Sequence, residues 1–143
     1  MRSTPFREDT DLAPIPFKRD HRLAAKRLKE KGLPWRPHVG CFVWDEAGII
    51  TVPSPFPDQV YFVLNLGHFF RKFGTLEQMV EKLVWLPTWH QARLVCQGMG
   101  IGQQEIWATL SPDGVERVGD ELLLIYDLIL KRLEKHQRKE VDA

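Results

Sequence analysis

The sequence predicts an α+β fold, in which helices pack mainly on one face of a four-stranded antiparallel sheet. Two hairpin patterns, at about 39–52 and 104–118, supply the strands, because β-rich residues flank a glycine-containing turn in each. Elsewhere apolar residues recur at helical spacing. The expected helices cover about 18–31, 58–73, 75–86, 88–98 and 120–137.

The length of 143 residues and a composition of 43% hydrophobic and 27% charged residues are those of one globular domain. We expect residues 18–143 to form that domain. Residues 1–17 hold three prolines among mixed charges and are expected to be a flexible N-terminal arm.

The first helix and the first hairpin follow the arm. Good helix formers fill 18–31, and Gly32 with Pro34 beyond it ends the helix. Its apolar stripe is narrow, so most of this helix is expected to face solvent. In the hairpin, Gly48 suits the left-handed position of a turn over residues 45–48.

The helix expected at 58–73 carries a candidate ligand site. On such a helix Tyr61, Asn65 and His68 fall on one line, and nearly every other residue is apolar. Two interpretations stay open: the polar line faces water, or it forms one wall of a cleft that is roofed by tryptophans. The candidate ligand-binding residues are Tyr61, Asn65, His68, Trp85, Trp89 and Trp107.

Two capping-box patterns predict the helices at 75–86 and 88–98. Together these helices have the outline of a helix-turn-helix, an arrangement that some DNA-binding proteins use. Only Lys82 and Arg93 are basic there, so a structural αα-hairpin is the favoured interpretation. The glycines within 98–102 end the second helix, and no strand precedes them as a phosphate loop would require.

The second hairpin and the last helix complete the chain. The hairpin turns at Ser111–Gly114, where Pro112 is preset for the second turn position. The helix at 120–137, like the one at 58–73, is apolar over more than half of its circumference. One sheet covers only part of that area, so we expect a homodimer interface to bury the rest.

Basic residues are concentrated near the N-terminus. Residues 1–40 hold ten Lys or Arg against five Asp or Glu, whereas the whole chain has a net charge of +1. A polyanion would therefore contact the first helix rather than the protein as a whole. The candidate contacts are Arg22, Lys26, Arg27 and Lys29.

No pattern in the sequence names a reaction or a cofactor. Cys41 and Cys96 are too few for a disulfide framework and indicate free thiols in a reducing cytoplasm. His38 and Cys41 have a spacing that zinc sites use, but residues three apart on a strand face opposite sides. No apolar run reaches the ~20 residues of a membrane span. We therefore expect no metal, no cofactor and no membrane contact.

The function that these observations favour is a non-catalytic cytoplasmic interaction module, which binds a protein partner and associates with itself as a dimer. Two alternatives stay open. One is a small-ligand-binding protein or enzyme whose pocket contains Tyr61, Asn65 and His68. The other is nucleic-acid binding through the basic first helix.

Overall fold

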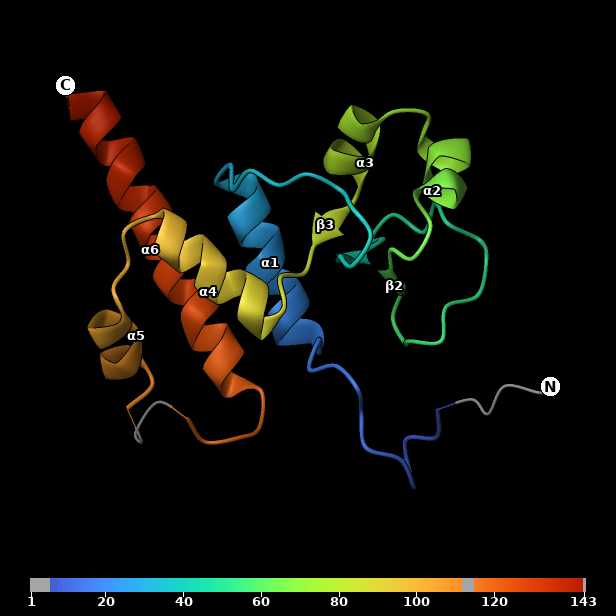
Figure 1. Ribbon diagram of the computed structural model, residues 1–143, viewed down its shortest axis with the longest axis horizontal. Coiled ribbons are helices and arrows are strands. Elements are labelled where there is room, and N and C mark those ends of the chain that lie inside the picture. The colour runs from blue at the N-terminus through green and yellow to red at the C-terminus, as the bar shows by residue number, and fades with distance from the viewer. Residues whose placement is uncertain (1–5, 112–114, 143) are drawn as a thin grey trace.

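The computed structural model describes residues 6–111 and 115–142, and within them the fold is α+β (Figure 1). The described chain has six helices and three short strands. The helices are α1 (Arg19–Glu30), α2 (Leu66–Phe73), α3 (Leu76–Lys82), α4 (Trp89–Gly98), α5 (Gln103–Thr109) and α6 (Asp120–Asp142). The strands are β1 (Phe42–Trp44), β2 (Val60–Phe62) and β3 (Val84–Trp85).

The sheet has three antiparallel strands within the described residues, in the order β2-β1-β3. Phe42 of β1 lies opposite Phe62 of β2, and Trp44 of β1 lies opposite Val84 of β3. The prediction of four strands from two hairpins is therefore wrong. Both neighbours of β1 come from segments that the sequence predicts to be helical.

The predicted hairpin at 39–52 has the right first strand and the right turn, but its return strand is wrong. Gly48 has a φ of +70°, and its N–H donates to the Asp45 carbonyl at 3.2 Å. The N–H groups of Ile49 and Ile50, one of which a return strand would pair with β1, donate to the Asp45 carboxylate at 3.1 and 2.7 Å. A side chain that satisfies backbone donors in this way competes with strand pairing, and β2 pairs with β1 instead.

The predicted hairpin at 104–118 is wrong in its first arm, because Gln103–Thr109 is the helix α5. Its one buried side chain, Ile106, belongs to the core cluster that includes α6. A short run with few apolar residues fits either the strand or the helix period, so packing on α6 decides its conformation. Of the turn expected at Ser111–Gly114, residues 112–114 lie outside the described residues.

The helix predicted at 58–73 is in fact the strand β2 followed by the shorter helix α2. Asn65 caps α2, since its Oδ1 accepts a hydrogen bond from the Gly67 N–H at 2.8 Å. Tyr61 and His68 thus lie on different elements. The polar line that the sequence predicts on one helix does not form.

The other helices lie near their predicted positions, with one exception. The elements α1, α4 and α6 correspond to the helices predicted at 18–31, 88–98 and 120–137. The side chains of Thr88 and Gln91 form the expected capping box at the start of α4. The exception is the helix predicted at 75–86, which ends at Lys82 because the next residues pair with β1 as β3.

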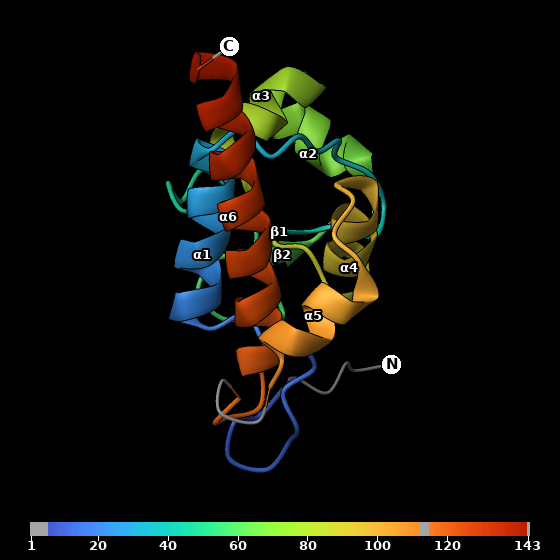
Figure 2. The same cartoon turned by 90° about the vertical axis from the view of Figure 1, so that its left-hand side faces the viewer.

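The helix α6 is the centre of the larger core. It lies between α1 on one side and α4 and α5 on the other (Figure 2). Four of its side chains are buried there, namely Leu122, Ile125, Tyr126 and Ile129. A smaller core gathers side chains of the sheet, α2 and α3. The apolar side of α6, on which the predicted dimer interface depends, is thus largely covered within the chain.

Candidate functional site

The six residues of the predicted ligand pocket are spread over five places in the fold. Tyr61 is buried in β2, where its hydroxyl donates to the Val52 carbonyl at 2.7 Å, whereas His68 is exposed on α2. The other four are Asn65 before α2, Trp85 in β3, Trp89 on α4 and Trp107 on α5. Because α2 and α5 lie at opposite sides of the molecule (Figure 1), no single pocket contains all six. Their role in ligand binding stays a prediction.

Three of the four basic residues proposed on α1 have partners within the protein. The guanidinium of Arg22 lies 5.3 Å from the centroid of an indole ring and 3.6 Å from the Asp58 carboxylate. Lys26 pairs with a glutamate carboxylate at 2.7 Å, and Lys29 donates to two main-chain carbonyls at the end of α3. In the described part of the chain, only the Arg27 side chain among these four lacks such a partner.

The described residues offer little for covalent or metal chemistry. Both cysteines are buried, and burial raises the pKa of the Cys41 and Cys96 thiols, which opposes formation of a reactive thiolate. Across residues 6–111 and 115–139, no group of three or more His, Cys, Asp or Glu side chains is placed to hold a metal ion. A search of the described helices finds none with the length and apolar character of a membrane span.

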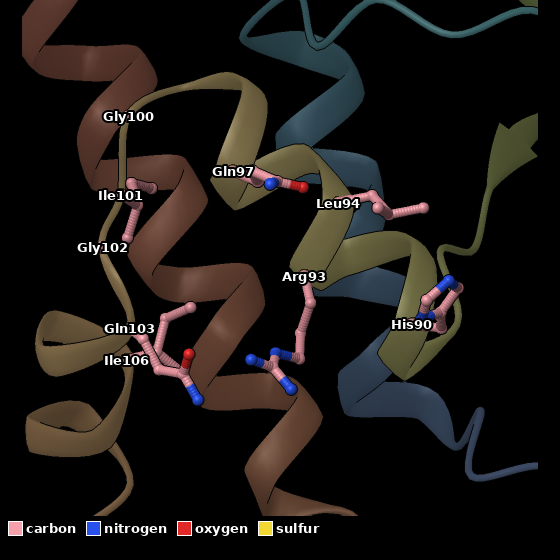
Figure 3. A pocket seen from close by; sticks show the side chains of 9 residues that line it. All are labelled: His90, Arg93, Leu94, Gln97, Gly100, Ile101, Gly102, Gln103 and Ile106. Carbon is pink, nitrogen blue, oxygen red and sulfur yellow. The ribbon is translucent and has the colours of Figure 1, made fainter.

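A groove of about 570 Å³ lies between α4 and α5 (Figure 3). The apolar side chains of Leu94, Ile101 and Ile106 line it together with the polar side chains of His90, Arg93, Gln97 and Gln103. The side chain of Arg93 extends from α4 towards α5. The volume of the groove is within the range of ligand-binding sites.

The polar side chains of this groove have no partners within the described protein. Arg93 is half-buried, yet its guanidinium makes no ion pair or side-chain hydrogen bond among residues 6–111 and 115–139. The same holds for the side chains of His90, Gln97 and Gln103, which are exposed. Four polar side chains without a partner in the described protein, one of them cationic, therefore line the same groove.

The groove belongs to a compact unit made of α4, residues 99–102 and α5. Gly100 has a φ of +74° and donates its N–H to the Gln97 carbonyl at 3.2 Å, while Ile101 donates to the Cys96 carbonyl at 2.9 Å. This pair of bonds with a left-handed glycine is the Schellman motif, which ends a helix and turns the chain sharply. Two helices joined by such a short turn are the arrangement that αα-hairpins and helix-turn-helix motifs share.

The second helix of this unit lies at the surface of the protein, against α6. Of the seven residues of α5, only Ile106 is buried, and it joins Cys96 and Ile101 in the core cluster. On the side of α5 that faces α6, Glu105 accepts two hydrogen bonds from Arg132, at 2.9 and 3.1 Å. Arg132 also donates to the Met99 carbonyl at 3.2 Å, so a single side chain fixes both α5 and the turn to α6.

From the sequence, 75–98 has the outline of a helix-turn-helix, and a structural αα-hairpin is the favoured interpretation there. In the structure β3 lies between α3 and α4, and the short turn instead joins α4 to α5. The signal for the second helix was the four-residue spacing of Ile106 and Leu110, which fits a helix as well as a strand.

A comparison of the chain with family models, curated proteins and solved structures finds no match.

Proposed function

We propose that the protein binds double-stranded DNA through the unit formed by α4 and α5. In this arrangement α5 enters the major groove and α4 lies across the phosphate backbone. The observation that supports it is the exposed second helix: six of its seven residues are not buried, and Arg93, a cation without a partner among the described residues, lies beside it. The proposal places nucleic-acid contact on α4 and α5 rather than on α1.

The dimensions of the unit are compatible with this role. An α-helix with its side chains is about 10–12 Å across, and the major groove of B-DNA is about 12 Å wide. Because α5 is attached to the body through Ile106 and Glu105, the side of the helix away from these two residues is exposed and would face base edges. The groove between the helices would then lie over the sugar-phosphate strand, where Arg93 would contact a phosphate.

The charge of the unit sets the expected strength of binding. Arg93 is the single Lys or Arg within 88–111, and Glu105 is neutralised by Arg132. Few phosphate contacts mean a shallow salt dependence, with a slope of about −0.9 for each phosphate neutralised. Binding is therefore expected at low salt, with micromolar or weaker affinity at physiological salt, as for non-specific complexes (roughly 10⁻⁴–10⁻⁶ M).

Fluorescence anisotropy of a short labelled duplex, measured at several salt concentrations, tests the proposal. We expect saturable binding at low salt, which Arg93→Ala weakens several-fold while the salt slope becomes shallower by about one. Arg71→Ala is the matched control, because Arg71 is an exposed arginine on α2, outside the unit. Thermal unfolding checks that both variants are folded.

Two results would contradict the proposal. One is the absence of saturable duplex binding at low salt, and the other is an equal loss of binding in Arg71→Ala and Arg93→Ala. A mononucleotide that competes as well as the duplex would show that the groove takes a small phosphate-bearing ligand instead.

A further inference from the structure

The last turns of α6 extend beyond the unit formed by α4 and α5. Figure 1 and Figure 2 show that the C-terminal part of α6 continues past the turn that joins α4 to α5. Arg132 marks the point of contact, because its guanidinium donates to the Glu105 carboxylate of α5 and to the Met99 carbonyl of the turn. Residues that follow Arg132 on the same side of α6 therefore lie beside the unit.

Two lysines follow Arg132 on this side of α6. Lys135 and Lys139 come three and seven residues after Arg132, positions that share one side of an α-helix. Both are exposed, and neither forms an ion pair among the described residues. Glu134, the acidic residue next to them, comes two residues after Arg132 and so faces away from this side. Beyond Arg132, the described residues on the side of α6 next to the unit thus include two cations and no carboxylate.

These lysines supply charge that the unit lacks for a complex with DNA. Arg93 is the single Lys or Arg of the unit, whereas each strand of a duplex presents a phosphate about every 3.4 Å along its axis. Lys135 and Lys139 are four residues apart, about 6 Å along the helix axis, so both ammonium groups can contact phosphates of one strand. The basic residues of α1 are less suitable, because three of the four proposed from the sequence have partners within the protein.

We infer that Lys135 and Lys139 contact the phosphate backbone beside the segment of the duplex that α5 enters. The inference rests on the proposed DNA binding. Three cations then neutralise phosphates, one on α4 and two on α6. Since each contributes about −0.9, the slope of log affinity against log salt concentration is about −2.7, and two thirds of it comes from α6.

The salt dependence of duplex binding, measured by fluorescence anisotropy, tests the inference. Between 50 and 200 mM salt, a slope of about −2.7 lowers the affinity of the wild type about 40-fold. In Lys135→Ala combined with Lys139→Ala, the remaining slope of about −0.9 lowers the affinity only about three- to fourfold over the same range. Lys135→Arg combined with Lys139→Arg keeps both charges and should retain the wild-type slope.

Lys72→Ala combined with Lys82→Ala is the matched control. These two lysines are exposed on α2 and α3, outside the unit, and their removal changes the net charge by the same amount. The control should therefore keep the wild-type slope. Because the helix dipole also favours cations near the end of α6, thermal unfolding of each variant separates a loss of stability from a loss of binding.

The outcomes separate the inference from the proposed function. A salt slope that the alanine substitutions at Lys135 and Lys139 leave unchanged, or that the control substitutions reduce equally, would overturn the inference and leave DNA binding through α4 and α5 standing. A slope that depends on the two lysines, together with binding that Arg93→Ala does not weaken, would support the lysine contact and overturn the proposed role of α4 and α5. Absence of saturable duplex binding at low salt would overturn both.

Discussion

His21 of α1 is joined to the chain segment just before α6. Its Nε2 donates to the Gly119 carbonyl at 2.8 Å, and the ring is only 3% exposed. The other ring nitrogen, Nδ1, is buried and has no partner among the described residues. Since the carbonyl can only accept, the neutral imidazole carries its proton on Nε2, and a second proton would have to enter a buried position without an acceptor.

Burial is the main cause of the lowered pKa of His21. The Gly119 carbonyl, Asp20 and Asp120 favour the charged form and oppose this effect, whereas Lys18 adds to it. A histidine whose pKa is lower in the folded than in the unfolded chain binds more protons when unfolded. Its contribution to stability is therefore complete above the unfolded pKa of ~6.5 and is lost as the pH falls below that value.

The prediction is that acid destabilises the protein through His21. Between pH 7.5 and 5 the free energy of unfolding should fall, by no more than about 1.4 kcal/mol per pH unit for this one proton. In His21→Gln the fall should be smaller, because glutamine does not titrate. Urea unfolding at each pH measures both, with His68→Gln, an exposed histidine on α2, as the control. Equal pH dependence in wild type and His21→Gln would contradict the assignment.

Among the elements, those with local signals are the ones that the sequence predicts well. Thr88 and Gln91 specify the start of α4, and the glycines after it specify its end, all within a few residues. The errors occur where a distant contact decides. The Asp45 carboxylate accepts hydrogen bonds from backbone N–H groups of the expected return strand. β1 pairs instead with β2 and β3, which lie farther along the chain.

The residues of the candidate site are likewise predicted where the signal is local and missed where a distant contact decides. The sequence places Arg93 and Gln97 on a helix that ends in a glycine turn, and the structure agrees. It misses Gln103 and Gln104 as helical residues, because α5 is seven residues long and has one buried side chain. A helix so short is marginal on its own and depends on packing, here through Ile106 and the bonds from Arg132.

Two neighbouring glycines at the turn of the unit allow a prediction about the free energy of unfolding. Gly98 lies within α4, whereas Gly100 has a φ of +74°, and neither site would bring an added Cβ within 4 Å of other atoms. Gly100→Ala should therefore lower the free energy of unfolding by about 1–2 kcal/mol, the cost of a left-handed L-residue. Gly98→Ala should instead raise it by up to about 1 kcal/mol through helix propensity.

Chemical denaturation of the two variants provides the measurement. Since both replacements add one methyl group to open space, a difference in sign can come only from the backbone conformation. Equal effects of the two substitutions would mean that the Schellman turn does not limit the stability of the unit. Gly100→Ala should also weaken duplex binding, because it disturbs the orientation of α5 relative to α4.

At the scale of the whole molecule, the arrangement of apolar surface determines the expected state of association. The buried side of α6 packs on α1, α4 and α5, so it is not available to a second copy. Large apolar side chains that remain exposed are distributed over separate elements, including Phe62 on β2, Phe70 on α2, Leu94 on α4 and Trp107 on α5. Single exposed apolar residues are normal on soluble monomers and do not make a dimer interface.

We therefore expect a monomer of 16.7 kDa in sedimentation at micromolar concentration, in place of the dimer that the sequence predicts. Under the proposed DNA binding, a monomer offers one α5 to the duplex, so each site should bind one chain without cooperativity, and a second copy does not reinforce the weak electrostatics of the unit. Twice the chain mass in the absence of DNA would contradict this expectation, because a dimer would then need an interface other than the covered face of α6. Sigmoidal binding to a duplex long enough for two chains would show that DNA itself brings two monomers together.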